Sequence, residues 1–149
     1  MTNERPTERS SNLSPPAPIS RFVVTHRRDR TMPLAFAERS CTPCRGGMPP
    51  LTPEEAPGYH QGAPGWEMLD GARRIERTYC FKNFREAFAF VERAAALAEG
   101  EGHHPEIRFG WGYATISLHT KKIKGLHEND FIMAAKLDRI ATNGGQPTA

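Results

Sequence analysis

Two adjacent histidines, His103 and His104, are the side chains of this chain that best suit chemistry. Histidine is the residue whose ordinary pKa lies nearest neutrality, so a pair of imidazoles can give and take protons at physiological pH. Adjacent side chains project in different directions, whereas metal-binding pairs usually stand about two to four residues apart. The pair therefore suits proton transfer on one small substrate better than one metal ion, although such a dipeptide is also common at solvated junctions.

A helix is predicted to end just before the pair. Asn83 can cap this helix, since Glu86 follows three residues later, and the helical pattern runs to about Glu99. Gly100 and Gly102 then release the chain from the helix. The apolar residues predict a buried stripe of Phe84, Phe88, Val91 and Ala95, with the small residues Ala87, Ala94 and Ala98 beside it.

A hairpin and a second long helix are predicted after the pair. Apolar side chains alternate over residues 107–111 and again over 114–118, and Gly112 between the two runs favours a turn. Residues 119–124 form a polar, basic exit from the second strand. The final helix is predicted over residues 128–141, with an apolar stripe of Phe131, Ala134, Leu137 and Ala141.

Another hairpin is predicted upstream of the first long helix. Strand patterns at residues 66–69 and 75–81 flank Asp70-Gly71, a pair that is frequent in hairpin turns. Arg77 interrupts the apolar face of the second strand. The sequence therefore supplies four strands in two adjacent pairs.

A short first helix is predicted to begin at Thr52, which is a good N-cap with Glu55 three residues later. Pro57-Gly58 should end this helix after one or two turns, so Tyr59 to Pro64 is expected to be a loop.

Together these elements predict an α+β fold, in which two β-hairpins form a four-stranded antiparallel sheet. Two long helices and the short first helix pack on one face of this sheet. Edge strands remain unpaired in such a sheet, so we expect a homo-oligomer, a dimer or tetramer formed by sheet extension or helix packing.

The 149 residues are long enough for one domain and too short for two. Residues 1–31, rich in Ser, Thr, Pro and Arg, are predicted to be a disordered extension. Residues 32–50 form a cysteine-containing leader, residues 51–143 the single domain, and residues 144–149 a flexible tail.

The charge of the chain argues against nucleic acid as a partner. Residues 1–31 contain six arginines and three acidic residues, and basic and acidic residues are equal in number in the remainder. No apolar run approaches the roughly 18 residues of a membrane-spanning helix. Three cysteines without a secretory h-region indicate a reducing compartment. A soluble, cytoplasmic protein is therefore expected.

Cys41 and Cys44 form a C-x-x-C pair, which can be half of a tetrathiolate zinc site or a redox dithiol. A second C-x-x-C pair is absent from the sequence, and no strand-helix context of the thioredoxin kind surrounds this one. The favoured interpretation is a loop whose cysteines are not essential. The alternative is half of a metal site that a symmetry-related copy completes. We expect neither a metal nor a cofactor.

The spacing of the histidines and their neighbours adds a more specific prediction. The pattern comprises Glu99, His103, His104, Pro105, Trp111, Gly125, Leu126 and Asp130. It resembles that of the pterin-4a-carbinolamine dehydratases, also called 4a-hydroxytetrahydrobiopterin dehydratases. The resemblance covers residues 66–141, and the segment from Cys41 to Cys44 also looks like leaders of bacterial members.

The resemblance implies a metal-free hydro-lyase on an α+β fold that forms dimers or tetramers. Its substrate is the 4a-hydroxytetrahydropterin that aromatic amino acid hydroxylases release, and its product is the quinonoid dihydropterin. The elimination needs an acid at the C4a hydroxyl and a base at N5. By position, His103 and His104 are the catalytic pair, and Glu99 and Asp130 are supporting carboxylates.

The resemblance leaves the substrate wall and the third proton-handling group open. Trp66 or Trp111 could form a flat wall for the pterin beside Pro105, or could simply pack in the core. The family pattern places a third histidine where this chain has Lys121, a poor base at neutral pH. Either Lys121 or His119, two residues earlier, is expected to fill that role.

An alternative function belongs to another class. The same resemblance allows a non-catalytic dimerisation or interaction protein, or a pterin-related accessory protein on the same fold.

Overall fold

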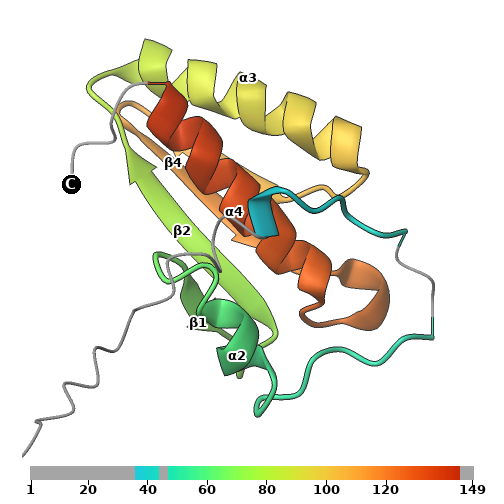
Figure 1. Ribbon diagram of the computed structural model, residues 1–149. Coiled ribbons are helices and arrows are strands. Elements are labelled where there is room, and N and C mark those ends of the chain that lie inside the picture. Colours follow the sequence, from blue (N-terminus) through green and yellow to red (C-terminus); the bar gives the residue numbers. More distant parts are fainter. Residues whose placement is uncertain (1–35, 44–46, 145–149) are drawn as a thin grey trace, which may run out of the picture.

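The computed structural model of the protein describes residues 36–43 and 47–144. The predicted disordered extension, Cys44 and most of the predicted tail lie outside the described residues. Within the described part, a four-stranded sheet is covered on one face by helices (Figure 1). The predicted α+β fold with a four-stranded antiparallel sheet is confirmed.

The strands form the two predicted hairpins. Their bounds are Glu67–Leu69 for β1, Arg74–Cys80 for β2, Glu106–Gly110 for β3 and Tyr113–Leu118 for β4. Every pairing is antiparallel, and the order across the sheet is β1-β2-β4-β3. The hairpins are joined where β2 pairs with β4, so β1 and β3 are the two edge strands.

Helices α2, α3 and α4 and one 3-10 turn follow in the described part of the chain, where Phe36 and Ala37 are helical as well. Their bounds are Ala56–His60 for α2, Phe84–Glu101 for α3, Lys121–Ile123 for the 3-10 turn η1, and Glu128–Asn143 for α4. Both ends of α3 follow the sequence signals: the Asn83 side chain accepts a hydrogen bond from the Glu86 N–H at 2.9 Å, and Gly102 adopts a left-handed backbone with φ of 64°.

The prediction for α2 was wrong at Pro57. Thr52 and Glu55 form the reciprocal capping bonds, but they close a turn ahead of the helix. Pro57 then lies in the first turn of α2, where a missing N–H costs no helical hydrogen bond. The helix therefore starts at Ala56 and continues through Pro57 to His60, into the predicted loop.

The predicted stripe of α3 was wrong for Phe84, Phe88 and Ala95, which are exposed, whereas the small residues predicted beside it are buried. The residues that α3 buries are Ala87, Phe90, Ala94 and Ala98. Phe84 and Phe88 are 49% and 45% exposed and pack at the surface against Phe109 of β3, with ring centroids 5.6 and 6.1 Å apart. Alanines on the inner face let the helix approach the sheet closely, which turns these two phenylalanines outward.

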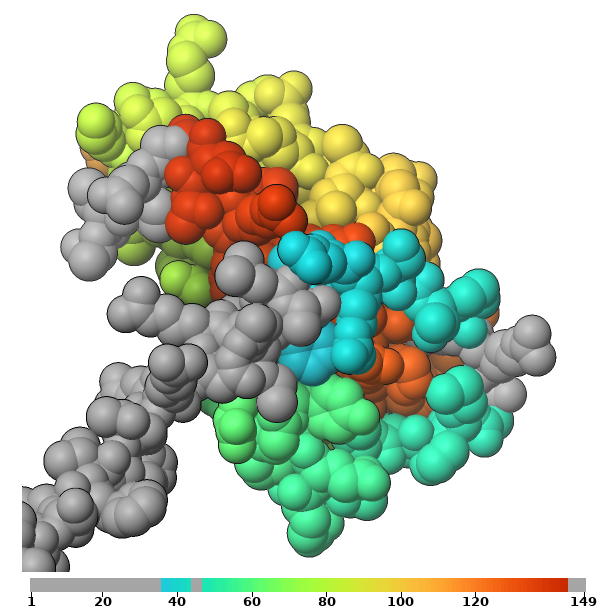
Figure 2. Space-filling view, viewed as in Figure 1, coloured from blue at the N-terminus to red at the C-terminus, as the bar shows by residue number. Residues whose placement is uncertain are grey.

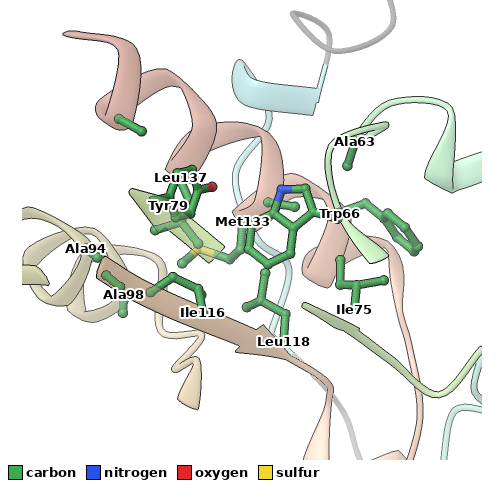
Figure 3. Packing of buried hydrophobic residues seen from close by; sticks show 14 of the residues in the cluster. Ala63, Trp66, Ile75, Tyr79, Ala94, Ala98, Ile116, Leu118, Met133 and Leu137 are labelled. Atoms are coloured by element: carbon green, nitrogen blue, oxygen red, sulfur yellow. The ribbon is translucent and has the colours of Figure 1, made fainter. Parts of the chain in front are cut away.

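The core lies between the sheet and the helices. It includes Ile75 and Tyr79 of β2, Ile116 and Leu118 of β4, and Met133 and Leu137 of α4 (Figure 3). The predicted stripe of α4 is confirmed, since all four of its residues are buried. No helix within residues 36–43 and 47–144 has the length and apolar character needed to cross a membrane.

Arg77 faces this core and is neutralised there. Its guanidinium lies 2.9 Å from Oδ1 of Asp138 in α4 and 4.9 Å from the centre of the Tyr79 ring. Trp66 Nε1 also donates to Asp138 at 3.1 Å, and the Tyr79 hydroxyl donates to the same carboxylate. Burial raises the pKa of Asp138, and these donors offset only part of that rise. Asp138 thus ties α4 to β2.

Candidate active site

One cavity of about 380 Å³ contains both histidines of the predicted pair. We call it the histidine cavity. Its lining residues are Pro43, Gly102, His103, His104, His119, Thr120, Lys121 and Lys122. They come from the end of α3, from the segment after β4 and from the leader, so three distant parts of the sequence build this cavity.

His103 is held by a buried carboxylate. Its Nε2 lies 2.7 Å from Oδ1 of Asp130, which is 0% exposed. Oδ2 of Asp130 accepts from the Thr120 hydroxyl at 2.9 Å and from the His127 N–H at 2.8 Å. Two donors already point at this carboxylate, which as an ion can only accept, so we assign the proton of the His103–Asp130 hydrogen bond to Nε2 of His103. In the neutral ring, Nδ1 of His103 is then the basic nitrogen.

Local helix chemistry sets the positions of these groups. Asp130 is the third residue of α4 and forms a capping box with His127, so the start of the helix fixes the carboxylate. At the end of α3, the left-handed Gly102 lets the His103 N–H donate to the Ala98 carbonyl at 3.2 Å. Two helix ends therefore meet across the His103–Asp130 hydrogen bond.

His104 has a similar partner in a different environment. Its Nε2 lies 3.0 Å from Oε1 of Glu99, and the two side chains are 60% and 79% exposed. The site thus contains one imidazole oriented by a buried carboxylate and one imidazole that is open to water. Two imidazoles in such unlike surroundings can serve as separate acid and base.

Both candidates for the third group reach the same cavity. β4 ends at Leu118, and His119 follows it in a loop rather than in a continued strand. An isolated bridge between Thr120 and Gly125 then turns the chain through η1 and brings Lys121 to the cavity. The Lys121 Nζ lies 3.5 Å from Oε1 of Glu106, in an exposed ion pair.

Comparisons with known proteins identify the family. A family model described as pterin 4 alpha carbinolamine dehydratase matches residues 49–140. A curated protein of Azoarcus sp. (strain BH72) is 61% identical over 109 residues, which are 73% of this chain and 93% of that protein. Another, from Cupriavidus pinatubonensis, is 56% identical over 103 residues, 69% of this chain and 89% of that protein. Both are named provisionally as pterin-4-alpha-carbinolamine dehydratases. The chain belongs to the pterin-4a-carbinolamine dehydratase family.

A solved structure agrees with this assignment. The crystal structure described as a transcriptional coactivator/pterin dehydratase from Brucella melitensis matches with a TM-score of 0.58 at 36% identity. The match covers 62% of this chain and 98% of that one. The predicted family and the predicted class of enzyme, a dehydratase among the hydro-lyases, are confirmed.

The tryptophans of this dehydratase chain lie away from the histidine cavity. Trp66 is 2% exposed in the core, and its indole N–H donates to Asp138. It therefore packs in the core, the alternative to forming a wall for the pterin. Trp111 is 73% exposed in the turn after β3. Five residues of β3 separate that turn from the histidines, roughly 15 Å of strand. Pro105 is half-buried next to the pair but is not among the residues that line the cavity.

The leader contributes a wall that sequence reasoning missed. The Thr42 backbone forms a pair of hydrogen bonds with the side chain of Asn129: its N–H donates to Oδ1 at 3.0 Å and its carbonyl accepts from Nδ2 at 2.6 Å. Figure 2 shows the leader, in cyan, lying against α4. Pro43, the next residue, lines the histidine cavity. No periodicity in the sequence indicates this contact, since Asn129 resembles any polar residue at a helix start.

Glu101 provides a second attachment for the leader. Its Oε2 accepts from the Cys41 N–H at 2.8 Å, while Lys136 of α4 pairs with Oε1. Burial acts to raise the pKa of Glu101, but the hydrogen bonds from Lys136 and Cys41 leave it below its ordinary value. This carboxylate therefore joins the leader, α3 and α4 close to the cavity.

The Cys41 thiol is poorly suited to redox or metal chemistry. Burial and the nearby Glu101 carboxylate raise its pKa to about 12, so the thiol stays protonated at neutral pH. Its Sγ lies 3.8 Å from the Asn129 carbonyl oxygen. Over residues 36–43 and 47–144, no three His, Cys, Asp or Glu side chains gather in a way that could hold a metal ion.

Proposed function

We propose that the protein removes water from a 4a-hydroxytetrahydropterin to give the quinonoid dihydropterin. The observation that carries this proposal is the pairing of His103 with the buried Asp130, beside the exposed His104 in one cavity. Membership of the dehydratase family supports the class of substrate.

In the proposed mechanism, His103 is the base and His104 is the acid. Nδ1 of His103 takes the N5 proton, and Asp130 stabilises the imidazolium that forms. Protonated His104, paired with Glu99, donates its proton to the C4a hydroxyl. The C4a–O bond breaks, water leaves, and the electron pair of the N5–H bond forms the C4a=N5 double bond. After this step His103 is protonated and His104 is neutral, so His103 must give a proton to solvent and His104 must take one from solvent before the next turnover.

Lys121 and His119 are proposed to assist at the departing hydroxyl. Both side chains border the cavity, and a lysine ammonium can stabilise a developing negative charge on oxygen without acting as a base. In the cell, the reaction would recycle the pterin of an aromatic amino acid hydroxylase.

We also propose that the working enzyme is a homo-oligomer. β1 and β3 have unpaired edges within the described sheet, and β3 carries Phe109 beside Phe84 and Phe88 of α3. A second copy could extend the sheet at β3 or pack on these rings.

The test is a direct assay of dehydration of 4a-hydroxytetrahydrobiopterin by the pure protein. We expect His104→Ala to lower kcat by at least about a hundredfold with the circular dichroism spectrum unchanged. His119→Ala or Lys121→Ala should lower turnover as well, and unchanged turnover in both would contradict their assisting role. Asn143→Ala, an exposed change at the far end of α4, is the control. Absence of any acceleration by the wild-type protein would refute the proposed function.

A further inference from the structure

A second cavity, of about 520 Å³, adjoins the histidine cavity. We call it the basic cavity. Its lining residues are Asp70, Arg73, Arg74, His119, Lys121 and Lys124. They belong to the turn between β1 and β2, to the start of β2 at Arg74 and to the segment that follows β4. His119 and Lys121 line both cavities, so the two cavities adjoin at these side chains.

Cations dominate this cavity. Four of its six lining residues are Arg or Lys, and one is acidic. Arg74 is engaged by Asp70 and Glu76, each at 2.8 Å. Arg73 and Lys124 have no carboxylate within salt-bridge distance in the described part of the chain. The basic cavity therefore has uncompensated positive charge, which attracts an anion.

The backbone on both sides of the basic cavity is unusual. Asp70, Ala72 and Lys124 have φ of 55°, 64° and 54°, and they are the residues other than glycine with positive φ in the described chain. This conformation is unfavourable for residues with a side chain and is found often at binding sites. Here it occurs in the two turns that carry Arg73 and Lys124.

We propose that the basic cavity binds a phosphate group carried on the side chain of the pterin substrate. This inference rests on the proposed function, because the pterin ring would lie in the histidine cavity and its side chain would pass His119 and Lys121. Arg and Lys donors together suit phosphate, which offers several oxygens to charge-assisted hydrogen bonds. The preferred substrate is then a phosphorylated tetrahydropterin rather than one with a neutral side chain.

The test compares two dihydropterins that differ only at the end of a hydroxypropyl side chain, one with a free hydroxyl and one with a phosphate. By titration calorimetry in low salt, wild-type protein should bind the phosphorylated compound at least about tenfold more tightly. The double variant Arg73→Gln, Lys124→Gln should lose this preference and keep its affinity for the neutral compound. Lys82→Gln, Arg85→Gln removes two exposed cations elsewhere and should keep the preference.

The same titration separates the two sources of phosphate. Equal wild-type affinity for both compounds would overturn the proposal, as would a preference that survives in the Arg73 and Lys124 variant. If inorganic phosphate binds but the phosphorylated pterin binds no more tightly than the neutral one, the cavity is a site for a free anion. That result would also overturn the proposal. Because binding needs no turnover, a phosphate preference in a protein without dehydratase activity would support this inference and refute only the proposed reaction.

Discussion

Two carboxylates back the two imidazoles of the proposed site, and they differ sharply in exposure to water. Asp130 is fully buried with three donors around it, while the Glu99 side chain is 79% exposed. A buried acceptor fixes the tautomer of its histidine, whereas an exposed ion pair contributes little because water competes with it. The chemistry should therefore depend far more on Asp130 than on Glu99.

Replacing these carboxylates by amides measures that difference. Asp130→Asn keeps the shape of the side chain, but its amide nitrogen, a donor, would face Nε2 of His103. Nε2 then has no acceptor, and the ring proton moves to Nδ1, which can no longer act as the base. We expect kcat to fall by about a hundredfold or more with little change in KM, as for other oriented histidines. Glu99→Gln should cost about tenfold or less. Equal losses in the two variants would contradict the separate roles of the imidazoles.

The cysteines should differ in reactivity. Cys80 is exposed on β2, while the raised pKa of Cys41, about 12, keeps that thiol protonated. Iodoacetamide at pH 8 should therefore label Cys80 in the folded protein and Cys41 only after unfolding, as measured by mass spectrometry of peptides. Rapid labelling of Cys41 in the native protein would contradict this prediction and show that its thiolate forms readily at pH 8.

Sequence reasoning at the scale of residues found the charged partners and missed the neutral ones. The chemistry of His103, His104, Glu99 and Asp130 is visible in their residue types, and the family resemblance indicated Glu99 and Asp130 as supporting carboxylates without saying which histidine each one faces. Thr120 donates to the buried carboxylate, but a threonine in a basic segment carries no such signal. Its role depends on the turn that the Thr120–Gly125 bridge creates.

Among the elements, the leader has an attachment that should depend on pH. The lowered pKa of Glu101 means that the folded protein binds its proton more weakly than the unfolded chain does. This contribution to stability is present above the ordinary glutamate value of about 4.3 and is lost as pH falls through the lowered one. Neutral and mildly acidic solutions should leave the leader in place.

Hydrogen exchange of the Cys41 and Thr42 amides tests this expectation. Protection should be constant from about pH 7 to pH 5, after correction for intrinsic exchange, and should fall below about pH 4. Glu101→Gln should weaken protection at every pH and remove the acid transition. An unchanged transition in that variant would assign it to another group.

The helices show where periodicity suffices and where it does not. The stripe of α4 was predicted correctly because Phe131 and Leu137 mark it and the alanines between and after them lie on the same side. On α3, the face with Phe84 and Phe88 lies next to a face with three alanines. Hydrophobicity alone predicted that the phenylalanine face would be the buried one. The alanine face is buried because close approach of a helix to a sheet requires small side chains. The buried face combines Phe90 with three alanines, so hydrophobicity alone did not identify it.

For the molecule as a whole, the exposed aromatic cluster of Phe84, Phe88 and Phe109 next to an edge strand predicts self-association. Phe88→Glu should shift the protein toward monomer in sedimentation velocity, because a charge cannot be buried in an apolar contact. The matched control is Ala96→Glu, at an exposed position of the same helix. A wild-type monomer at micromolar concentration, or an oligomer unaffected by Phe88→Glu, would contradict this prediction.

The architecture followed from the sequence more readily than the site did. Turn signals at Asp70-Gly71 and Gly112, together with alternating apolar residues, were enough for both hairpins and for an antiparallel sheet. The histidine cavity needed more, because Pro43 precedes its other lining residues by more than fifty positions, and the contact between Thr42 and Asn129 has no local pattern. Contacts of this kind form only when the folded chain brings distant segments together.

The two tryptophans give this fold two optical probes with opposite surroundings. Trp66 is enclosed in the core, with its indole N–H on Asp138, and Trp111 stands in water on a hairpin turn. In a Trp111→Phe protein the remaining fluorescence should be blue-shifted and protected from iodide quenching, and it should report on the joint between β2 and α4. In a Trp66→Phe protein the signal should come from the open end of the β3–β4 hairpin. Unfolding and self-association could thus be followed separately, without an added dye.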